Sequence, residues 1–554
     1  MAIKVNIGGE FFDRIRQNGS YYVDKTELLY ELAHESDNAV TLFTRPRRFG
    51  KTLMMTTIQS FFDIQRDSRE VFRGLDITKH EEFCRAWMNQ YPVLFLTLKD
   101  AEGLSFQSAY GMLKSAVSDV CKRHEYLSRS EKVNPSDVEM FMRLQGNRAS
   151  DDEIKKSLLI LTRMLAAHYG KPVILLIDEY DVPLAKANEE KEGGERYYPQ
   201  MLEVIRSIMS AALKSNDYLK FAVITGCLRI AKESIFTGVN NFKSYSVLDR
   251  DFSTYFGFTD TEVKDLLKAA DRENRLDLVR SWYDGYVFGN TKVFCPWDVM
   301  NDVADSRNNP DLRPKNYWKN TSGNGIIRDL VERFDTDVRY DLEALMNGES
   351  ITKTISDELT YDTLHLSEDN LWSVLLMTGY LTKADPDEEG NTVALRIPNA
   401  EIAGIFQDTV AKYFSEHLDE SAQKAMMTAL WNGDEAAASK AISDFLWQTI
   451  SYMDYHEDYY HAFLTGIFVG RGYAVESNRE HGLGRPDIRL TDHRNRRILI
   501  IEAKKSETAA QMDHDCDEAL KQIVDQEYAK GLDAYRVLCY GIAFYQKTTL
   551  VKKL

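Results

Sequence analysis

Residues 43–52 read Phe-Thr-Arg-Pro-Arg-Arg-Phe-Gly-Lys-Thr, and they have the types and the order that bind nucleotide phosphates. The apolar residues just before them predict a buried strand, and residues 53–62 predict a helix without Gly or Pro. At the start of such a helix the backbone amides and the helix dipole attract phosphate oxygens. We therefore expect Gly50 and Lys51 to bind the phosphates, with Lys51 at the β- and γ-phosphates, and the hydroxyl of Thr52 to bind Mg²⁺.

One position departs from the usual phosphate-binding pattern, which opens with a glycine where this chain has Arg45. A side chain at that position requires a loop backbone that does not need a positive φ there. Arg47 and Arg48 add positive charge to the loop, and either could contact the nucleotide. Taken alone, the segment could also be a basic turn before a helix.

A second segment supplies the acidic residues that such a site needs. Residues 172–178 form an unbroken apolar run that predicts a central strand of a parallel sheet, and Glu179 follows Asp178 at its end. Sheets of this class bind ligands at that end. We expect Asp178 to hold Mg²⁺, directly or through water, and Glu179 to polarise the attacking water. The alternative is a strand that ends in a solvated acidic turn. Together, the two segments predict binding of ATP or GTP.

Strand and helix patterns alternate through residues 1–250, which predicts a parallel P-loop NTPase sheet with helices on both faces. Residues 219–226 predict a further strand, and Thr225 near its end lies where a polar side chain could sense the γ-phosphate. Arg229 follows one helical turn later. Each of these two residues could instead be a plain strand end or a solvated arginine. Three arginines could contact the nucleotide of their own subunit or that of a neighbouring one: Arg47, Arg48 and Arg229. Contact with a neighbouring subunit would require a homo-oligomer.

Strand patterns become sparse in residues 251–452, which predicts a mostly helical lid region. An apolar helix is expected over residues 371–381, followed by a hairpin that turns at Gly390 and Asn391. A helix followed by a hairpin is similar to a winged-helix module, which could bind DNA. The acidic residues around this hairpin favour a role in internal packing.

Residues 453–554 contain a second set of chemically capable side chains, in a segment that predicts an α/β domain. Glu502 and Lys504 follow each other with period two on an expected strand, so they lie on one face, and a hairpin can bring Asp487 beside them. Two carboxylates would bind Mg²⁺ or Mn²⁺, the metal would activate a water, and Lys504 could orient that water or stabilise the phosphate. Glu476 is a candidate third acid.

Spacing alone is weak support for this second site, because an acid and a Glu-x-Lys sequence often occur by chance. The local charge adds support, since residues 474–505 contain eight Arg and Lys against five Asp and Glu. Such a basic excess fits a nucleic-acid substrate. The whole chain has a net charge of −17, so any contact with nucleic acid must rely on local basic patches.

From the sequence we expect a cytoplasmic protein. Apolar runs long enough to cross a membrane and the layout of a secretion signal are both absent from the sequence, so no membrane partner is expected. Six cysteines are scattered without Cys-x-x-Cys spacing, which predicts free thiols rather than disulfides or a zinc site.

These motifs together resemble a prokaryotic family in which an AAA-ATPase-like domain is joined to a C-terminal domain of the PD-(D/E)xK nuclease superfamily. In that family the loop Arg-Pro-Arg-Arg-Phe-Gly-Lys-Thr is normal, so Arg45 does not count against nucleotide binding. The resemblance covers nearly the whole chain. It implies ATP hydrolysis, a nuclease fold over residues 453–554 like that of restriction endonucleases and, from the architecture, a role in defence or mobile-element conflict. The segments that carry it are residues 22–26, 45–52, 176–181, 225–226, 229–236, 282–286, 317–318, 320–324, 484–487 and 502–504.

Two hypotheses follow from the sequence. In the first, the chain is an ATP- and Mg²⁺-dependent hydrolase whose C-terminal domain is a nuclease that cuts DNA or RNA. In the second, it is a nucleotide-dependent switch whose C-terminal domain binds nucleic acid or a partner without cutting it. Binding of a divalent ion at Glu502 would separate the two, because only a nuclease needs it.

Overall fold

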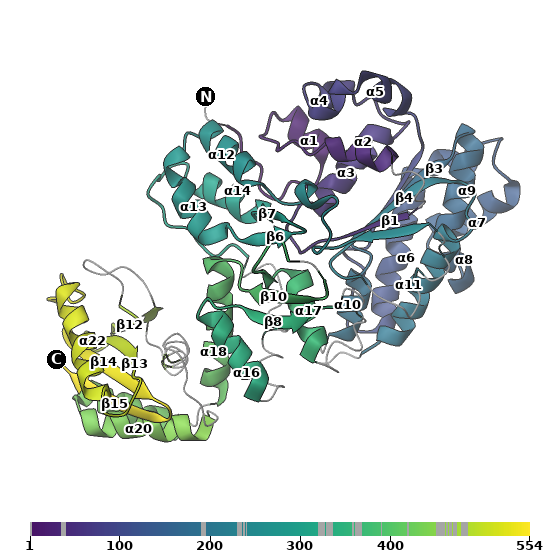
Figure 1. Ribbon diagram of the computed structural model, residues 1–554. Coiled ribbons are helices and arrows are strands. Elements are labelled where there is room, and N and C mark those ends of the chain that lie inside the picture. Colours follow the sequence, from purple (N-terminus) through teal and green to yellow (C-terminus); the bar gives the residue numbers. More distant parts are fainter. Residues whose placement is uncertain are drawn as a thin grey trace. The chain divides into compact units, whose positions relative to one another are not determined.

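The structure of the protein is a computed structural model (Figure 1). It describes residues 3–34, 40–189, 196–229, 241–318, 336–356, 368–388, 390–417, 420–449, 474–477 and 486–554, together with positions 235, 236, 239, 327, 359, 460, 464 and 468. Parts of the segments that carry the family resemblance, namely residues 230–234, 320–324 and 484–485, lie outside the described residues.

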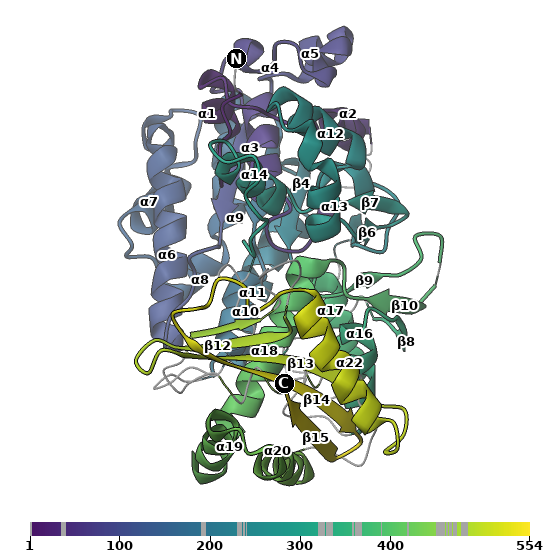
Figure 2. The same cartoon turned by 90° about the vertical axis from the view of Figure 1, so that its left-hand side faces the viewer.

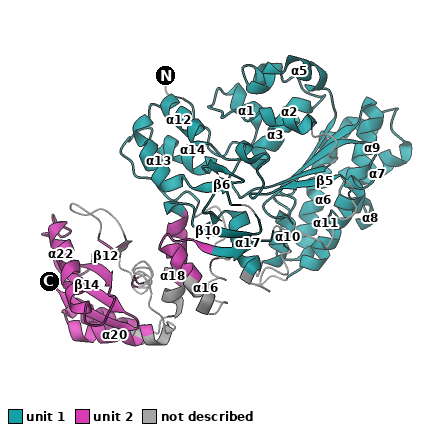
Figure 3. Ribbon diagram, in the orientation of Figure 1, with its two compact units in different colours: residues 1–318, 352–401 teal, residues 319–351, 402–554 magenta. Residues whose placement is uncertain are grey.

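The chain divides into two compact units, which Figure 3 shows in different colours. Unit 1 comprises residues 1–318 and 352–401, and unit 2 comprises residues 319–351 and 402–554. The division into three domains at residues 250 and 452 stays a prediction. Among the described residues, no helix combines the length and the apolar content that crossing a membrane requires.

Unit 1 is built around a five-stranded sheet in which neighbouring strands are parallel. The order of the strands is β2-β3-β4-β1-β5, so β4 lies between β1 and β3. The predicted parallel sheet is therefore confirmed, and the central strands are apolar because helices cover both faces. The strands are β1 (Val40–Thr44), β2 (Val93–Thr97), β3 (Val173–Asp178), β4 (Leu219–Gly226) and β5 (Phe242–Tyr245).

Helices cover both faces of this sheet, as Figure 1 shows. Helix α3 (Lys51–Phe62) packs against β2, β3 and β4 on one side. On the other side α6 (Phe106–Arg123) and α9 (Ser157–Tyr169) contact the sheet, with α11 (Tyr198–Leu213) and α7 (Pro135–Gln145) packed against them; α6 and α7 run side by side in Figures 1 and 2. The other helices of this part are α1 (Phe12–Gln17), α2 (Glu27–His34), α4 (Arg69–Phe72), α5 (Glu81–Trp87), α8 (Asp151–Lys155) and α10 (Val182–Asn188).

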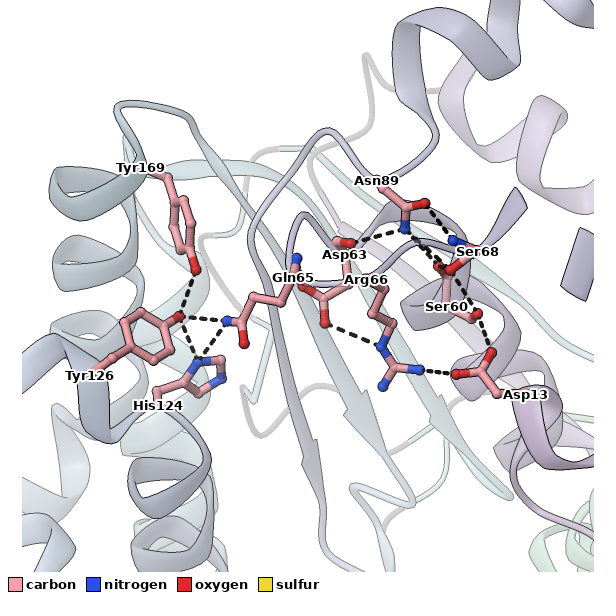
Figure 4. A network of polar contacts seen from close by, with 10 residues as sticks. All are labelled: Asp13, Ser60, Asp63, Gln65, Arg66, Ser68, Asn89, His124, Tyr126 and Tyr169. Carbon is pink, nitrogen blue, oxygen red and sulfur yellow. Dashed lines mark hydrogen bonds and ion pairs between the residues drawn. The ribbon is translucent and has the colours of Figure 1, made fainter. Parts of the chain in front are cut away.

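A polar network holds the C-terminal end of α3 in place (Figure 4). The Ser60 hydroxyl donates to Asp13 of α1, and Arg66 forms an ion pair with the same carboxylate. Asn89 donates from its amide nitrogen to the carbonyls of Ser60 at 3.1 Å and Asp63 at 3.0 Å. These bonds satisfy carbonyl groups that the end of a helix leaves without partners. They fix α3, whose opposite end begins at the phosphate-binding loop.

The same network continues through Gln65, which donates to the Tyr126 hydroxyl at 2.5 Å (Figure 4). The Nδ1 atom of His124 lies 3.1 Å from that hydroxyl, and the ring is buried. Burial, with a smaller contribution from Arg123, lowers the pKa of His124 to about 4. His124 is therefore neutral in the folded protein at pH 7.

We expect His124 to make folding sensitive to mild acid. Its pKa is about 6.5 when unfolded and about 4 when folded, so the unfolded chain binds more protons between these values. The free energy of unfolding should therefore fall by about 2 kcal/mol more in the wild type than in His124→Gln between pH 7 and pH 5. Urea denaturation at both pH values measures this. An equal loss in the two proteins would contradict the assignment.

The rest of unit 1 packs helices and short strands beside the sheet. Helices α12 (Asp260–Ala269), α13 (Leu276–Tyr283) and α14 (Pro296–Asp305) share an apolar core that includes Val263, Val279 and Val299. The expected helix and hairpin are confirmed as α17 (Glu368–Thr378), β9 (Thr382–Lys383) and β10 (Thr392–Arg396), and β10 also pairs with β8 (Ile351–Thr354). The remaining two strands, β6 (Tyr286–Phe288) and β7 (Thr291–Val293), form a hairpin.

The β9–β10 hairpin packs inside unit 1. The Thr382 hydroxyl accepts a hydrogen bond from the backbone of Val287 at 2.8 Å. Lys383 is buried, and its ammonium donates to the carbonyls of Gly289 and Glu388, at 2.9 Å each. A lysine held in this way is not available to bind DNA phosphates. The contacts support the packing role that the acidic surroundings favoured.

Unit 2 contains a mixed sheet of five strands in the order β11-β12-β13-β14-β15. Only the central pair, β13 and β14, is parallel; the other three pairs are antiparallel. Helix α22 (Met512–Asp525) lies across one face of this sheet (Figure 2). The strands are β11 (Ala474–Ser477), β12 (Ile488–Asp492), β13 (Arg497–Lys505), β14 (Arg536–Tyr545) and β15 (Thr548–Lys553), and the other helices are α16 (Thr336–Met346), α18 (Ala400–His417), α19 (Glu420–Asn432) and α20 (Glu435–Thr449).

Helix α20 covers the outer edge of β15, which would otherwise be unpaired. Backbone amides on alternate residues of the strand donate to side chains spaced four residues apart on the helix, because four helical residues rise about as far as two strand residues extend. Such closure removes a strand edge that could pair with another chain. The three bonds join Thr549 to Ser443 at 2.9 Å, Val551 to Ser439 at 2.9 Å and Lys553 to Glu435 at 3.0 Å.

Candidate functional site

The phosphate-binding loop connects the end of β1 to the first turn of α3, as the sequence predicts. Gly50 precedes the helix in a left-handed conformation (φ 84°), which glycine adopts without strain. Lys51 is buried, and its ammonium donates to the carbonyls of Arg45 and Pro46 at 3.0 Å each. The loop thus curls around the charged end of Lys51, where phosphate oxygens would replace the carbonyls as acceptors.

Arg45 anchors the loop to the neighbouring strand. Its side chain is fully buried, donates to the carbonyls of Thr44 at 2.9 Å and Tyr245 at 2.8 Å, and lies over the rings of Phe256 and Phe288. The positive φ angles of the loop fall at Arg48 and Gly50 and not at Arg45, so the expectation about its backbone is confirmed. The residue that departs from the usual pattern therefore fixes the loop by its side chain.

Asp178, at the end of β3, connects the end of β4 to the first turn of α3. One oxygen accepts a hydrogen bond from the Thr52 hydroxyl at 2.8 Å, and the other accepts one from the Thr225 hydroxyl at 2.5 Å. Thr225 can reach Asp178 because β4 lies between β1 and β3. Burial raises the pKa of Asp178, partly offset by these two hydroxyls and by Lys51. A hydroxyl and a carboxylate in this geometry suit Mg²⁺, which prefers oxygen ligands.

Glu179 follows Asp178 in a left-handed conformation (φ 54°), which is uncommon for a residue other than glycine. Its amide donates to the Thr225 hydroxyl at 3.3 Å, which holds the backbone there. Burial, with Asp178 and Asp181 nearby, raises the pKa of the Glu179 carboxyl, while Lys51 lowers it. Strained residues of this kind gather at active sites, where surrounding contacts maintain them.

Tyr180 and Asp181 shape the turn that follows β4, a role that the sequence did not reveal. One oxygen of Asp181 accepts from the amides of Cys227 at 2.9 Å and Leu228 at 3.0 Å, and the Tyr180 hydroxyl donates to the Leu228 carbonyl. A side chain on Gly226 would collide with both of them. The sequence did hold a signal for this role. Residues 178–181 read Asp-Glu-Tyr-Asp, and only the first two were assigned to the nucleotide, which left Tyr180 and Asp181 without a role.

The three arginines do not share one location. The charge of Arg47 acts on Glu179, whereas Arg48 lies over the ring of Trp297, with 4.1 Å between the guanidinium carbon and the ring centroid. Arg47 and Arg48, which the sequence analysis treated alike, therefore have different neighbours in the structure. Arg229 follows the turn after β4, where its carbonyl accepts from Leu359, and its role at the nucleotide stays a prediction.

The second site lies in unit 2, at the end of β13. The antiparallel register pairs Ile488 with Ile501, so Asp487 stands opposite Glu502 one step further along. Asp487 accepts a hydrogen bond from the Ala503 amide at 2.8 Å, which fixes it across the two strands. Lys504 follows Glu502 on the same face, as the period of two predicts.

Glu502 is fully buried, and neither of its carboxylate oxygens has a hydrogen-bond partner of normal geometry. Burial raises the pKa of this carboxyl to about 9, and the neighbouring Asp487 adds to the shift while Lys504 opposes it. Two neighbouring carboxyl groups with a lysine beside them are a donor set that Mg²⁺ or Mn²⁺ would bind. Asp487 and Glu502 therefore fit a divalent metal.

Helix α22 covers the face of the sheet that carries Glu502. Gly541 pairs with Glu502 across β13 and β14, and a side chain there would meet the Cys516 carbonyl at 2.4 Å. Tyr528, just after α22, lies beside Glu502 and was not predicted; the only signal was a tyrosine shortly after a helical pattern. Glu476 pairs with Arg489, with 3.9 Å between their charged groups, so its role as a metal ligand stays a prediction.

Comparisons with known proteins match the two parts of the chain that contain these candidate sites. Residues 6–236 match the AAA-ATPase-like family, described as predicted AAA-ATPase. Residues 455–554 match the PD-(D/E)XK nuclease superfamily. A relative from Azotobacter chroococcum mcd 1, described as "Uncharacterized protein in vnfD 5'region", is 26% identical over 548 residues, which cover 96% of this chain and 94% of the relative. The chain thus joins an AAA-ATPase-like domain to a C-terminal domain of the PD-(D/E)XK nuclease superfamily.

Proposed function

We propose that unit 1 binds and hydrolyses ATP with Mg²⁺, and that this turnover gates cleavage of a phosphodiester bond in DNA or RNA by unit 2. The nucleotide half is carried by the hydrogen bonds that join Thr52, Asp178 and Thr225 beside the ammonium of Lys51. The cleavage half is supported by the buried carboxyl of Glu502, which lies beside Asp487 and Lys504 at the end of β13. ATP rather than GTP is proposed from the family match alone.

In the first reaction Lys51 would neutralise charge on the β- and γ-phosphates, and Thr52 and Asp178 would hold Mg²⁺. Glu179 orients and polarises the attacking water, which its raised pKa suits, because a base works best near the ambient pH. Thr225 holds the carboxylate of Asp178 and the amide of Glu179 at once, so it keeps the two acids in register.

In the second reaction Asp487 and Glu502 would hold Mg²⁺ or Mn²⁺, and Lys504 would stabilise charge on the scissile phosphate. When bound, the metal supplies a Lewis acid and lowers the pKa of a water. Tyr528 lies beside Glu502, where its hydroxyl would help to orient the carboxyl. The basic residues of β12 and β13 supply the positive charge that a nucleic-acid backbone requires.

The variant Glu179→Gln tests the coupling of the two reactions. Glutamine keeps the size and the backbone but cannot take a proton, so ATP hydrolysis should fall by about 10²-fold while the Kd for MgATP stays within about twofold. Phosphate release and calorimetric titration measure the two quantities, and cleavage of DNA and RNA is followed with Mn²⁺ in both proteins.

If ATP turnover gates cleavage, we expect the rate of cleavage by Glu179→Gln to stop responding to ATP, whereas that of the wild type should respond. Hydrolysis at the wild-type rate would refute the role of Glu179. If the wild type shows neither cleavage nor metal binding at Glu502 with any substrate, the nuclease half is wrong and a nucleotide-dependent switch remains.

A further inference from the structure

Arg48 has a left-handed backbone (φ 72°) in the middle of the phosphate-binding loop. An arginine adopts this conformation only where its surroundings hold it, because its side chain crowds the following carbonyl. A positive φ at this position decides which way the neighbouring amides point. Whatever holds Arg48 therefore also sets the loop that meets the phosphates.

The start of α14 holds Arg48 at two points. The guanidinium lies over the ring of Trp297, 4.1 Å from its centroid, which is a close cation–π contact. The thiol of Cys295 donates a weak hydrogen bond to the carbonyl of Arg48, with 3.8 Å between sulfur and oxygen. Both side chain and backbone are thus fixed by residues almost 250 positions later in the chain.

Trp297 is itself fixed on its other sides. The indole nitrogen donates to the Tyr317 carbonyl at 3.3 Å. Gly8 lies against the ring, so that a Cβ on this glycine would be 3.1 Å from Cζ3 of the indole. The ring therefore has little freedom to follow Arg48 if Arg48 moves.

Two buried carboxyl groups lie next to this contact. Asp298 is fully buried against Glu401, and the positive charge of Arg48 is among the groups that favour its ionised form. Glu401 accepts hydrogen bonds from the amides of Tyr317 at 2.5 Å and Trp318 at 2.8 Å. Burial and the neighbouring Glu401 raise the pKa of Asp298 well above its usual range, and Arg48 opposes this shift. Through Tyr317, Glu401 is tied to the segment that also holds Trp297.

We propose that Trp297 is a positioning residue for nucleotide binding, which holds Arg48 so that the phosphate-binding loop keeps its binding conformation. This inference rests on the proposed ATP binding. Trp297 does not touch the nucleotide in this account; it acts through Arg48. Loss of the ring should therefore weaken binding only while Arg48 is present.

A double-mutant cycle on the Kd for MgATP tests this directly. Trp297→Leu and Arg48→Ala should each raise the Kd by about fivefold, the usual worth of such a contact, and the double variant should also show about fivefold. Trp297→Phe keeps the aromatic face and should stay within about twofold of the wild type. The KM for ATP should rise with the Kd, and kcat at saturating ATP should change less.

Trp282 on α13 provides a matched control, because it is also a half-buried tryptophan packed in unit 1. Trp282→Leu should lower the melting temperature without changing the Kd. If Trp297→Leu does not fold, Trp297→Met fills a similar volume without the aromatic face and replaces it in the cycle. A fivefold effect of the Trp297 variant that persists in the Arg48→Ala background would overturn the proposal.

The outcome for Lys51→Ala separates the two levels of inference. If that variant binds MgATP like the wild type, the nucleotide site itself is wrong. If it loses binding while the Trp297 variants bind like the wild type, the nucleotide site stands and only the positioning role is wrong.

Discussion

Replacing Lys51 by alanine is expected to lower the rate of ATP hydrolysis by about 10³-fold, because its ammonium supplies the positive charge at the centre of the loop. That ammonium now donates to the carbonyls of Arg45 and Pro46, so it is already oriented into the space that the loop encloses. Phosphate release under saturating ATP, together with calorimetric titration of MgATP, measures the effect. Lys51→Met should behave alike, since its side chain has similar length without the charge.

The folded state should not suffer from the loss of Lys51. Its ammonium is buried, and a buried charge costs free energy that an apolar side chain does not. The free energy of unfolding of Lys51→Met should equal or exceed that of the wild type. Lys171→Met is the matched control: Lys171 precedes the opposite end of β3, donates to the Gln90 carbonyl at 2.9 Å, and should leave hydrolysis unchanged. Normal hydrolysis by Lys51→Met would refute the loop assignment.

The residues of the candidate nucleotide site could be predicted from the sequence, but the contacts between them could not. The acids appeared at the end of an apolar run, and the carboxyl ends of parallel strands meet at one edge of a sheet, so the place of Asp178 followed from the sequence. Its hydrogen bond to Thr225 depends on the strand order, which one sequence does not reveal. The role of Arg45 depends on partners at Tyr245 and Phe256, some 200 residues away, and no local rule relates them.

The candidate metal site shows the same limit. The period of two placed Glu502 and Lys504 on one face, and the hairpin register places Asp487 opposite Glu502, as expected. Tyr528 and Gly541 join the site only because α22 packs closely on that face of the sheet. Helix packing is set by the fit of side chains over the whole face, so it could not be derived from spacing.

Replacing Asp487 by asparagine is expected to lower cleavage of nucleic acid in Mg²⁺ or Mn²⁺ by about 10³-fold, which corresponds to the several kcal/mol that a bound metal contributes. Asparagine keeps a carbonyl oxygen that can accept the hydrogen bond from the Ala503 amide, so the strand geometry should persist. Gel assays of cleavage and calorimetric titration of Mn²⁺ measure the loss. ATP hydrolysis should remain measurable in this variant.

The free energy of unfolding gives an independent test of the same site, because the substitution that lowers cleavage should not lower stability. Without metal, the negative charge of Asp487 disfavours ionisation of the buried Glu502, so removing that charge should leave the free energy of unfolding unchanged or raise it. Mn²⁺ should raise the melting temperature of the wild type and not that of Asp487→Asn, because only a protein that binds the metal gains from it. Asp492→Asn is the matched control: Asp492 ends β12, the strand that Asp487 precedes, and pairs with Arg497 at 2.8 Å, so its loss should reduce stability and spare cleavage. A variant at Asp487 that loses stability but cuts normally would show that this pair of acids is structural, and unit 2 would then have to act without a metal between them.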